Sequence, residues 1–103
     1  MFTDYLRRHP DVEALFFCND DLAQGALLEA LRIGVKVPEQ LRVAGFNDLE
    51  GSECTVPRLT TVRTPRAEIG RRAATMLVRM MRGEAVPVAS VDVGFELVCR
   101  ESA

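Results

Sequence analysis

The fold of this chain is decided by residues 14–48, which read ALFFCNDDLAQGALLEALRIGVKVPEQLRVAGFND. Two short apolar runs, at residues 14–18 and 41–46, are each followed by the dipeptide Asn-Asp. The residues between them repeat their apolar positions with a helical period, so the stretch predicts a strand, a helix and a second, parallel strand. Parallel strands end at the same edge of a sheet, and ligands of open α/β sheets bind at that edge. We therefore expect the two Asn-Asp pairs to share an edge and to hold a small polar molecule.

Composition limits the chain to one small globular domain. Its 103 residues are 48% hydrophobic and 27% charged, which is typical of a folded protein rather than a disordered tail. Thirteen basic and fifteen acidic side chains give a net charge of −2. Modules that bind nucleic acid usually carry a basic excess, because they neutralise phosphates. The balance argues against DNA binding by these residues themselves.

The sequence gives no sign of a membrane or an oxidising compartment. No apolar run approaches the roughly 20 residues that span a bilayer, and residues 1–8 lack the apolar core of a secretory signal. The three cysteines, Cys18, Cys54 and Cys99, are far apart and form no CxxC pair. We expect reduced thiols in a cytoplasmic protein, without a disulfide framework or a zinc site.

Periodicity and turn residues predict the remaining elements. Residues 2–8 look like the end of a helix that stops before Pro10, and Gly34 suits the end of the helix that follows Asn19-Asp20. The other predicted elements are a first strand at 12–18 buried on both faces, a strand at 41–46, a helical turn at 50–55, a strand at 59–62, a helix at 66–82 with Thr64 as its cap, and strands at 88–93 and 95–98. This order indicates an α/β fold.

The apolar surface exceeds what so small a sheet covers. The first long helix has an apolar stripe, and Leu28 lies off it, which suggests a second contact surface. The stripe consists of Leu22, Ala23, Ala26, Leu27, Ala30 and Leu31. Helix 66–82 carries further apolar residues, among them Met80 and Met81. We infer a piece of a larger fold.

Several motifs, in order and at fixed spacing, resemble the C-terminal part of LacI/GalR-type bacterial transcriptional repressors. They are Phe17-Cys18-Asn19-Asp20-Asp21-Leu22-Ala23 with Gly25-Ala26-Leu27, Gly34-Val35-Lys36-Val37-Pro38-Glu39, Val43-Ala44-Gly45-Phe46-Asn47-Asp48, Pro57-Arg58-Leu59-Thr60-Thr61-Val62, and Ile69-Gly70 with Ala73-Ala74. The resemblance extends over nearly the whole chain.

The resemblance implies an incomplete three-layer lobe of the periplasmic-binding-protein-like type I fold. Such repressors bind a sugar, nucleobase or similar metabolite between two α/β lobes, and contact operator DNA through an N-terminal headpiece. Residues 1–103 would form the C-terminal part of the effector-binding and dimerisation domain, without the headpiece. Helix 66–82 would belong to the N-terminal lobe.

The implied effector site is built from Asn19, Phe46, Asn47 and Asp48. An Asn amide offers two donors and an acceptor to sugar hydroxyls. Relatives usually have Asp at the position of Asn47. Losing that carboxylate removes repulsion toward an anion, so we expect a sugar acid rather than a neutral sugar. The competing interpretations are that Asn19 or Asp20 caps the helix, that Asn47 only stabilises its turn, that Phe46 belongs to the core, and that Asp48 bonds nearby backbone.

The same resemblance implies a homodimer. Its interface would include Gln24 and Leu28 on the first long helix, and Ser52, Cys54 and Thr55 in the segment after the second strand.

The sequence shows no arrangement of residues that is typical of a catalytic site. His9 is the single histidine, and the sequence contains no glycine-rich phosphate loop. Asp20, Asp21 and Asp48 could suggest an acidic metal pocket, but capping explains them more simply, so we expect no metal and no cofactor. The leading prediction is the sugar- or sugar-acid-sensing, dimerising part of a LacI-type regulator. The alternatives are a periplasmic sugar-binding protein of the same fold and a small α/β enzyme.

Overall fold

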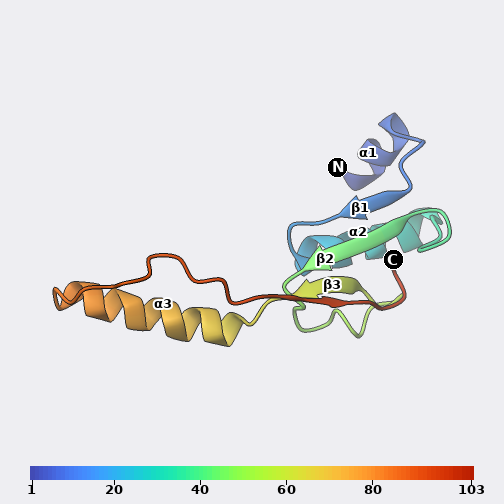
Figure 1. The fold of residues 1–103 in the computed structure, drawn as a ribbon. Coiled ribbons are helices and arrows are strands. Elements are labelled where there is room, and N and C mark those ends of the chain that lie inside the picture. Colours follow the sequence, from blue (N-terminus) through green and yellow to red (C-terminus); the bar gives the residue numbers. More distant parts are fainter. The chain divides into compact units, whose positions relative to one another are not determined.

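The computed structural model describes residues 1–103 and divides them into two compact units (Figure 1). The first unit, Met1–Arg63 with Glu96–Ala103, contains α1 (Phe2–Arg8), β1 (Ala14–Phe16), α2 (Asp20–Ile33), β2 (Arg42–Phe46), β3 (Thr60–Arg63) and β4 (Glu96–Val98). The second unit, Thr64–Phe95, contains α3 (Arg66–Met81). No helix is both long and apolar enough to span a bilayer.

The sheet has four strands in the order β1-β2-β3-β4. The first three strands are parallel, with Leu15 opposite Val43 and Ala44 opposite Thr60, and β4 runs antiparallel to β3. The predicted strand, helix and parallel strand are confirmed by β1, α2 and β2. The carboxyl ends of β1, β2 and β3 therefore meet at one edge.

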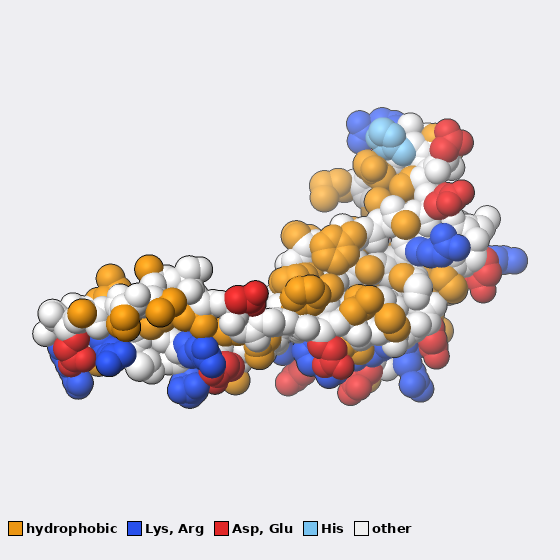
Figure 2. All heavy atoms as spheres, in the orientation of Figure 1, with side chains coloured by type: hydrophobic (Ala, Val, Ile, Leu, Met, Phe, Trp, Pro, Cys, Tyr) orange, Lys and Arg blue, Asp and Glu red, His pale blue; other side chains and the backbone are white.

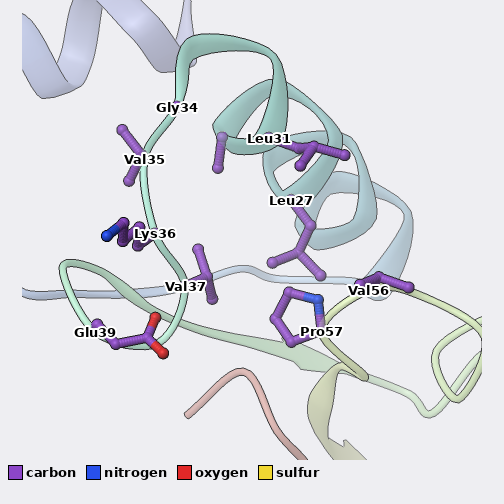
Figure 3. A pocket seen from close by; sticks show the side chains of 10 residues that line it. Leu27, Leu31, Gly34, Val35, Lys36, Val37, Glu39, Val56 and Pro57 are labelled. Carbon is purple, nitrogen blue, oxygen red and sulfur yellow. The ribbon is translucent and has the colours of Figure 1, made fainter.

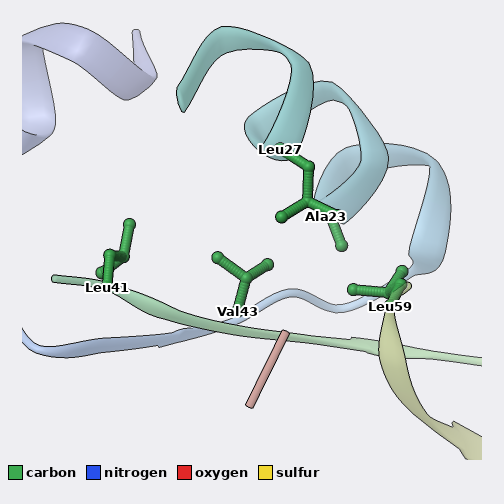
Figure 4. Packing of buried hydrophobic residues seen from close by; sticks show 5 residues of the cluster. All are labelled: Ala23, Leu27, Leu41, Val43 and Leu59. Carbon is green, nitrogen blue, oxygen red and sulfur yellow. The ribbon is translucent and has the colours of Figure 1, made fainter. Parts of the chain in front are cut away.

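The core lies between α2 and one face of the sheet (Figure 4). Ala23 and Leu27 of α2 point toward Val43 of β2, with Leu41 and Leu59 on either side. The predicted stripe is confirmed at Ala23, Ala26, Leu27 and Ala30, which are buried, whereas Leu22 and Leu31 are 50% and 70% exposed. The buried stripe is narrower than the predicted one, because the small sheet covers only the middle of the apolar face of α2.

Helix α2 begins and ends as its sequence predicts. The side chain of Asn19 accepts a hydrogen bond from the backbone N–H of Leu22 at 2.9 Å. Gly34 ends the helix with φ 77°, in the left-handed conformation that glycine adopts without steric cost. The cap is Asn19, so the interpretation of Asp20 as the cap is wrong.

Strand β1 differs from its prediction. It spans three residues rather than 12–18, and it lies at the edge of the sheet. Its Phe16 is 64% exposed on the face opposite α2. Helices cover only one face of this sheet, and Figure 2 shows hydrophobic side chains gathered over the strands of this unit.

Residues 88–93, a predicted strand, form no strand, and the last strand begins at Glu96. These residues alternate in the right pattern, but no neighbouring strand in the second unit offers a hydrogen-bonding partner. Residues 50–55 form successive tight turns rather than the predicted helical turn.

Helix α3 begins with Pro65 at its cap position, not Thr64, and buries none of its residues.

The segment after β4 closes a gap between β2 and β3. Ser102 is fully buried, and its backbone oxygen accepts from the N–H of Val43 at 2.7 Å. Its hydroxyl donates to the carbonyl of Val43 at 2.6 Å and accepts from the N–H of Thr60 at 2.8 Å. One serine thus satisfies backbone groups on two strands.

Candidate functional site

Asn19 and Asn47 both lie at the carboxyl edge of the sheet, after neighbouring parallel strands. Asn19 follows β1 at the start of α2, and Asn47 directly follows β2. The N–H of Asn47 donates to the carbonyl of Val62 on β3 at 2.8 Å, which fixes this residue at the strand ends. Capping uses one lone pair of the Asn19 carboxamide oxygen and leaves its two N–H donors for another partner.

The backbone at Asn47 and Asp48 is unusual. Both residues have positive φ, 97° and 49°, a region that side-chain-bearing residues visit rarely and that Asn and Asp enter more often than the others. Such conformations cost free energy and persist only where surrounding bonds hold them. Here the Val62 carbonyl holds Asn47, and the hydroxyl of Thr61 accepts from the N–H of Asp48 at 3.4 Å. Backbone of this kind is concentrated at ligand sites, which supports a binding role for this loop.

Asp48 forms ion pairs and does not bond nearby backbone, so that part of the prediction is wrong. Its carboxylate accepts from Arg63 Nε at 2.7 Å and from Arg100 at 2.8 Å. Burial opposes the ionised form, but the hydrogen bonds and charges of Arg100 and Arg63 outweigh it, and the pKa of Asp48 lies below its ordinary value. Arg63 also pairs with Glu96 at 3.1 Å.

Asp20 is a buried acceptor that the sequence pattern did not reveal. It is fully buried, and its Oδ1 accepts from the hydroxyl of Thr61 at 2.6 Å. Its Oδ2 accepts from the N–H of Leu49 at 2.6 Å and the hydroxyl of Ser52 at 2.9 Å. These donors are 29 to 41 residues away in sequence, so local capping rules could not find them.

Gly45 provides the space for this carboxylate. A Cβ at Gly45 would lie 2.1 Å from Oδ1 of Asp20. The group that approaches this glycine most closely is therefore the carboxylate of Asp20.

Phe46 is half-buried, and its ring meets that of Phe16 edge-to-face, with centroids 6.5 Å apart. Both rings lie on the sheet face opposite α2, because Ala23 and Leu27 pack against the other face.

The residues predicted at a dimer interface divide between a groove and the interior. Gln24, Leu28, Cys54 and Thr55 line one groove of about 440 Å³, which we call the α2 groove. The rest of its lining is Leu27, Leu31, Gly51 and Val56. Ser52 is fully buried beneath it, where its hydroxyl accepts from the amide of Gln24 at 3.5 Å.

A second hollow of about 390 Å³ adjoins this groove (Figure 3). It shares Leu27, Leu31 and Val56 with the α2 groove and continues along residues 34–39. Leu28 and Leu31 are each 70% exposed, so the outer side of α2 presents apolar side chains to solvent beside these two hollows. Such surfaces mark contacts with another protein.

No group of three or more His, Cys, Asp or Glu side chains that could hold a metal ion is present, and the three cysteines are free and exposed.

Comparisons with known proteins agree with this architecture. The family model described as periplasmic binding protein-like domain matches residues 2–103. The transcriptional regulator GntR of Pseudomonas aeruginosa is 62% identical over 102 residues, which are 99% of this chain and 30% of that protein. GntR of Escherichia coli K12 is 41% identical over 91 residues, 88% of this chain and 28% of that protein. The chain thus spans less than a third of the length of these relatives.

Solved structures show the same likeness. The regulator GntR from Chromobacterium violaceum superposes with a TM-score of 0.86 at 47% identity, covering 99% of this chain and 38% of that one. A cellobiose complex of the regulator CelR superposes at 0.89 with 32% identity, covering 99% and 31%. The resemblance to LacI-type regulators is confirmed, and the chain belongs to the periplasmic binding protein-like domain family.

Proposed function

We propose that this chain is the C-terminal part of the effector-binding and dimerisation domain of a LacI-type transcriptional regulator. The observation that carries the proposal is that Asn19 and Asn47 follow neighbouring parallel strands at one sheet edge, and that Asn47 and Asp48 have an unusual backbone conformation. Ligand binding there favours one arrangement of the regulator, and that arrangement changes operator affinity. Operator DNA is contacted through a headpiece outside these residues, in the cytoplasm, and no membrane is involved.

The comparisons favour regulation over the alternatives. The curated relatives are HTH-type transcriptional regulators rather than enzymes, and this proposal assigns the chain no catalytic step, metal or cofactor. The periplasmic sugar-binding alternative shares the fold but lacks support from these relatives.

The effector is a sugar or, by preference, a sugar acid. The CelR structure is a cellobiose complex, and a 30% identical LacI family regulator from Arthrobacter is a lactose complex with a TM-score of 0.81. Asn47 presents an uncharged amide where a carboxylate would repel an anion. Asn19 and Asn47 donate to ligand oxygens, Phe46 packs beside the sugar ring, and Asp48 acts through the arginines it pairs with.

The test is a calorimetric titration of the intact regulator with D-gluconate and D-glucose. We expect gluconate to bind more tightly, and Asn47→Asp to weaken gluconate by about tenfold, or 1.4 kcal/mol, through like-charge repulsion. Glucose binding serves as the control and should change little. Asp tolerates positive φ almost as well as Asn, so the variant keeps the loop. A wild-type preference for glucose would contradict the sugar-acid assignment.

The dimer forms through the α2 groove, and helix 66–82 belongs to a second lobe. Supporting the first point, Leu28 stands exposed between Gln24 and the turn that carries Cys54 and Thr55. Ser52 supports that contact from below. Supporting the second, α3 buries none of its residues, and its Leu77, Met80 and Met81 are exposed.

A further inference from the structure

The carboxylate of Asp20 joins the ligand edge to the α2 groove. Its Oδ2 accepts two hydrogen bonds, from the N–H of Leu49 at 2.6 Å and from the hydroxyl of Ser52 at 2.9 Å. Leu49 directly follows the Asn47-Asp48 backbone, and Ser52 lies within the segment 51–56, which forms one wall of the groove. A single oxygen atom is thus bonded to both parts.

The connection continues to the groove surface. The hydroxyl of Ser52 donates to Asp20 and accepts from the amide of Gln24, a groove-lining residue, at 3.5 Å. On the other side, the N–H of Leu49 is the next backbone donor after the residues with positive φ. The chain of contacts therefore runs from Gln24 through Ser52 and Asp20 to the ligand loop.

Burial makes the hydrogen bonds of Asp20 costly to break. Asp20, Ser52 and Thr61 are all fully buried, so a broken bond would leave a polar group without water to replace its partner. Gly45 fits against the same carboxylate, which leaves Asp20 little room to turn. A displacement of Leu49 must then be followed by Asp20 or Ser52.

We propose that Asp20 is a positioning residue that couples effector binding at the Asn19–Asn47 edge to self-association at the α2 groove, with Ser52 as the link between them. This inference rests on the proposed effector and dimer functions. The coupling is reciprocal: if effector binding changes the dimer dissociation constant, dimerisation changes effector affinity by the same factor.

Two conservative variants separate coupling from stability. Ser52→Ala removes the bond between Oδ2 and the groove, whereas Ser102→Ala removes the hydroxyl that bonds Val43 and Thr60 and leaves Asp20, the ligand loop and the groove connection intact. Both sites are fully buried and each variant removes one hydroxyl, so we expect similar losses of thermal stability. Gln24→Met removes the amide of half-buried Gln24 that donates to Ser52. This variant replaces Ser52→Ala in the experiment if Ser52→Ala does not fold.

The experiment is analytical ultracentrifugation of the intact regulator with and without saturating D-gluconate. We expect gluconate to change the dimer dissociation constant of wild type and Ser102→Ala by about fivefold or more, the usual lower range of such coupling. In Ser52→Ala and Gln24→Met the change should fall below about twofold.

The outcomes separate the two proposals. Equal gluconate dependence in Ser52→Ala and wild type would overturn the role of Asp20 and Ser52. So would a wild type that binds gluconate and dimerises without any dependence of one on the other. A wild type that neither binds gluconate nor self-associates would instead overturn the proposed effector and dimer functions, and this inference with them.

Discussion

Asp20 and Asp48 each follow an asparagine at the end of a strand, yet they serve different purposes. Asp20 is buried and accepts from two hydroxyls and one backbone N–H, without a cationic partner. Asp48 is about 11% exposed and lies between the guanidinium groups of Arg63 and Arg100. Residue type and position in the motif are the same, so the difference comes from neighbours supplied by distant segments.

Replacing Gly45 by Ala tests the fit of Asp20 into the sheet. The new Cβ would lie 2.1 Å from the Asp20 carboxylate, so the carboxylate must shift and weaken its bonds. We expect a loss of about 1–3 kcal/mol in the free energy of unfolding, measured by urea denaturation. Gly25→Ala, on α2 with no atom within 4 Å of the added Cβ, is the matched control and should stabilise by about 0.5–1 kcal/mol. Equal effects of the two substitutions would contradict the close contact.

The ion pairs of Asp48 predict a pH dependence of stability. Because the pKa of Asp48 is lower in the folded protein than in the unfolded chain, its contribution is complete above the ordinary carboxyl pKa and is lost as the pH falls through the folded value. We expect the free energy of unfolding to fall between about pH 5 and pH 2, and to fall less in Asp48→Asn. Asp11→Asn, at an exposed position, controls for the loss of one charge. If the free energy of unfolding of wild type and of Asp48→Asn changed with pH in the same way, the ion pairs of Asp48 would contribute nothing to stability.

At the scale of elements, α2 is the organising helix of the first unit. One side packs on β2 and on Leu59, just before β3, through Ala23 and Leu27. Another holds α1, where the hydroxyl of Thr3 donates to Glu29 at 2.6 Å. Hydrogen bonds from Arg32 and then Thr3 lower the pKa of Glu29 to about 2. The outer side carries Leu28 and Leu31, which line the α2 groove and remain 70% exposed.

That outer side predicts the effect of a charge on association. Leu28→Glu places a carboxylate in the α2 groove, which must be desolvated if a second copy covers it. We expect the dimer dissociation constant of the intact regulator to rise by about tenfold or more, measured by sedimentation. Leu22→Glu, also exposed on α2 but outside the groove, should leave association unchanged. An unchanged sedimentation profile for Leu28→Glu would place the interface elsewhere.

At the scale of the whole molecule, the two units differ in how they are held. The first unit has a buried core and a sheet whose strands come from both ends of the sequence. In the second unit α3 contains no buried residue, and its packing within the unit is limited to residues such as Val86, Val88 and Val91. A helix without a buried face gains little stability from packing.

Amide hydrogen exchange measures this difference directly. In the 103-residue chain we expect the amides of α3 to exchange much faster than those of α2, because local opening exposes little apolar surface. In the intact regulator, where we propose that a second lobe covers α3, its amides should become protected. The amides of α2 provide the internal control in both samples. Equal exchange of α3 in the two proteins would argue against a second-lobe contact.

Sequence patterns predicted the elements that depend on local signals. Asn19 and Gly34 bound α2 correctly, because capping involves residues only a few positions apart. The bonds of Asp20 and Asp48 could not be predicted, since their partners come from other strands or from the segment after β4. Residues 88–93 have the alternation of a strand but no partner to pair with, and β1 pairs with β2 over three residues only, Ala14–Phe16. The apolar pattern predicted an element correctly where these residues supply a packing or pairing partner for it, and wrongly where they supply none.

The bonds of Ser102 have a consequence for synthesis on the ribosome. The carbonyl of Val43 is made 59 residues before the hydroxyl that binds it, and the N–H of Thr60 is made 42 residues before the same group. At a synthesis rate of about 5–20 residues per second, roughly 3–12 s pass between the synthesis of Val43 and that of Ser102. During that interval the nascent strands have unpaired backbone groups and depend on water or a chaperone. Translation speed over the second half of the chain therefore sets how long this sheet stays open to misassembly.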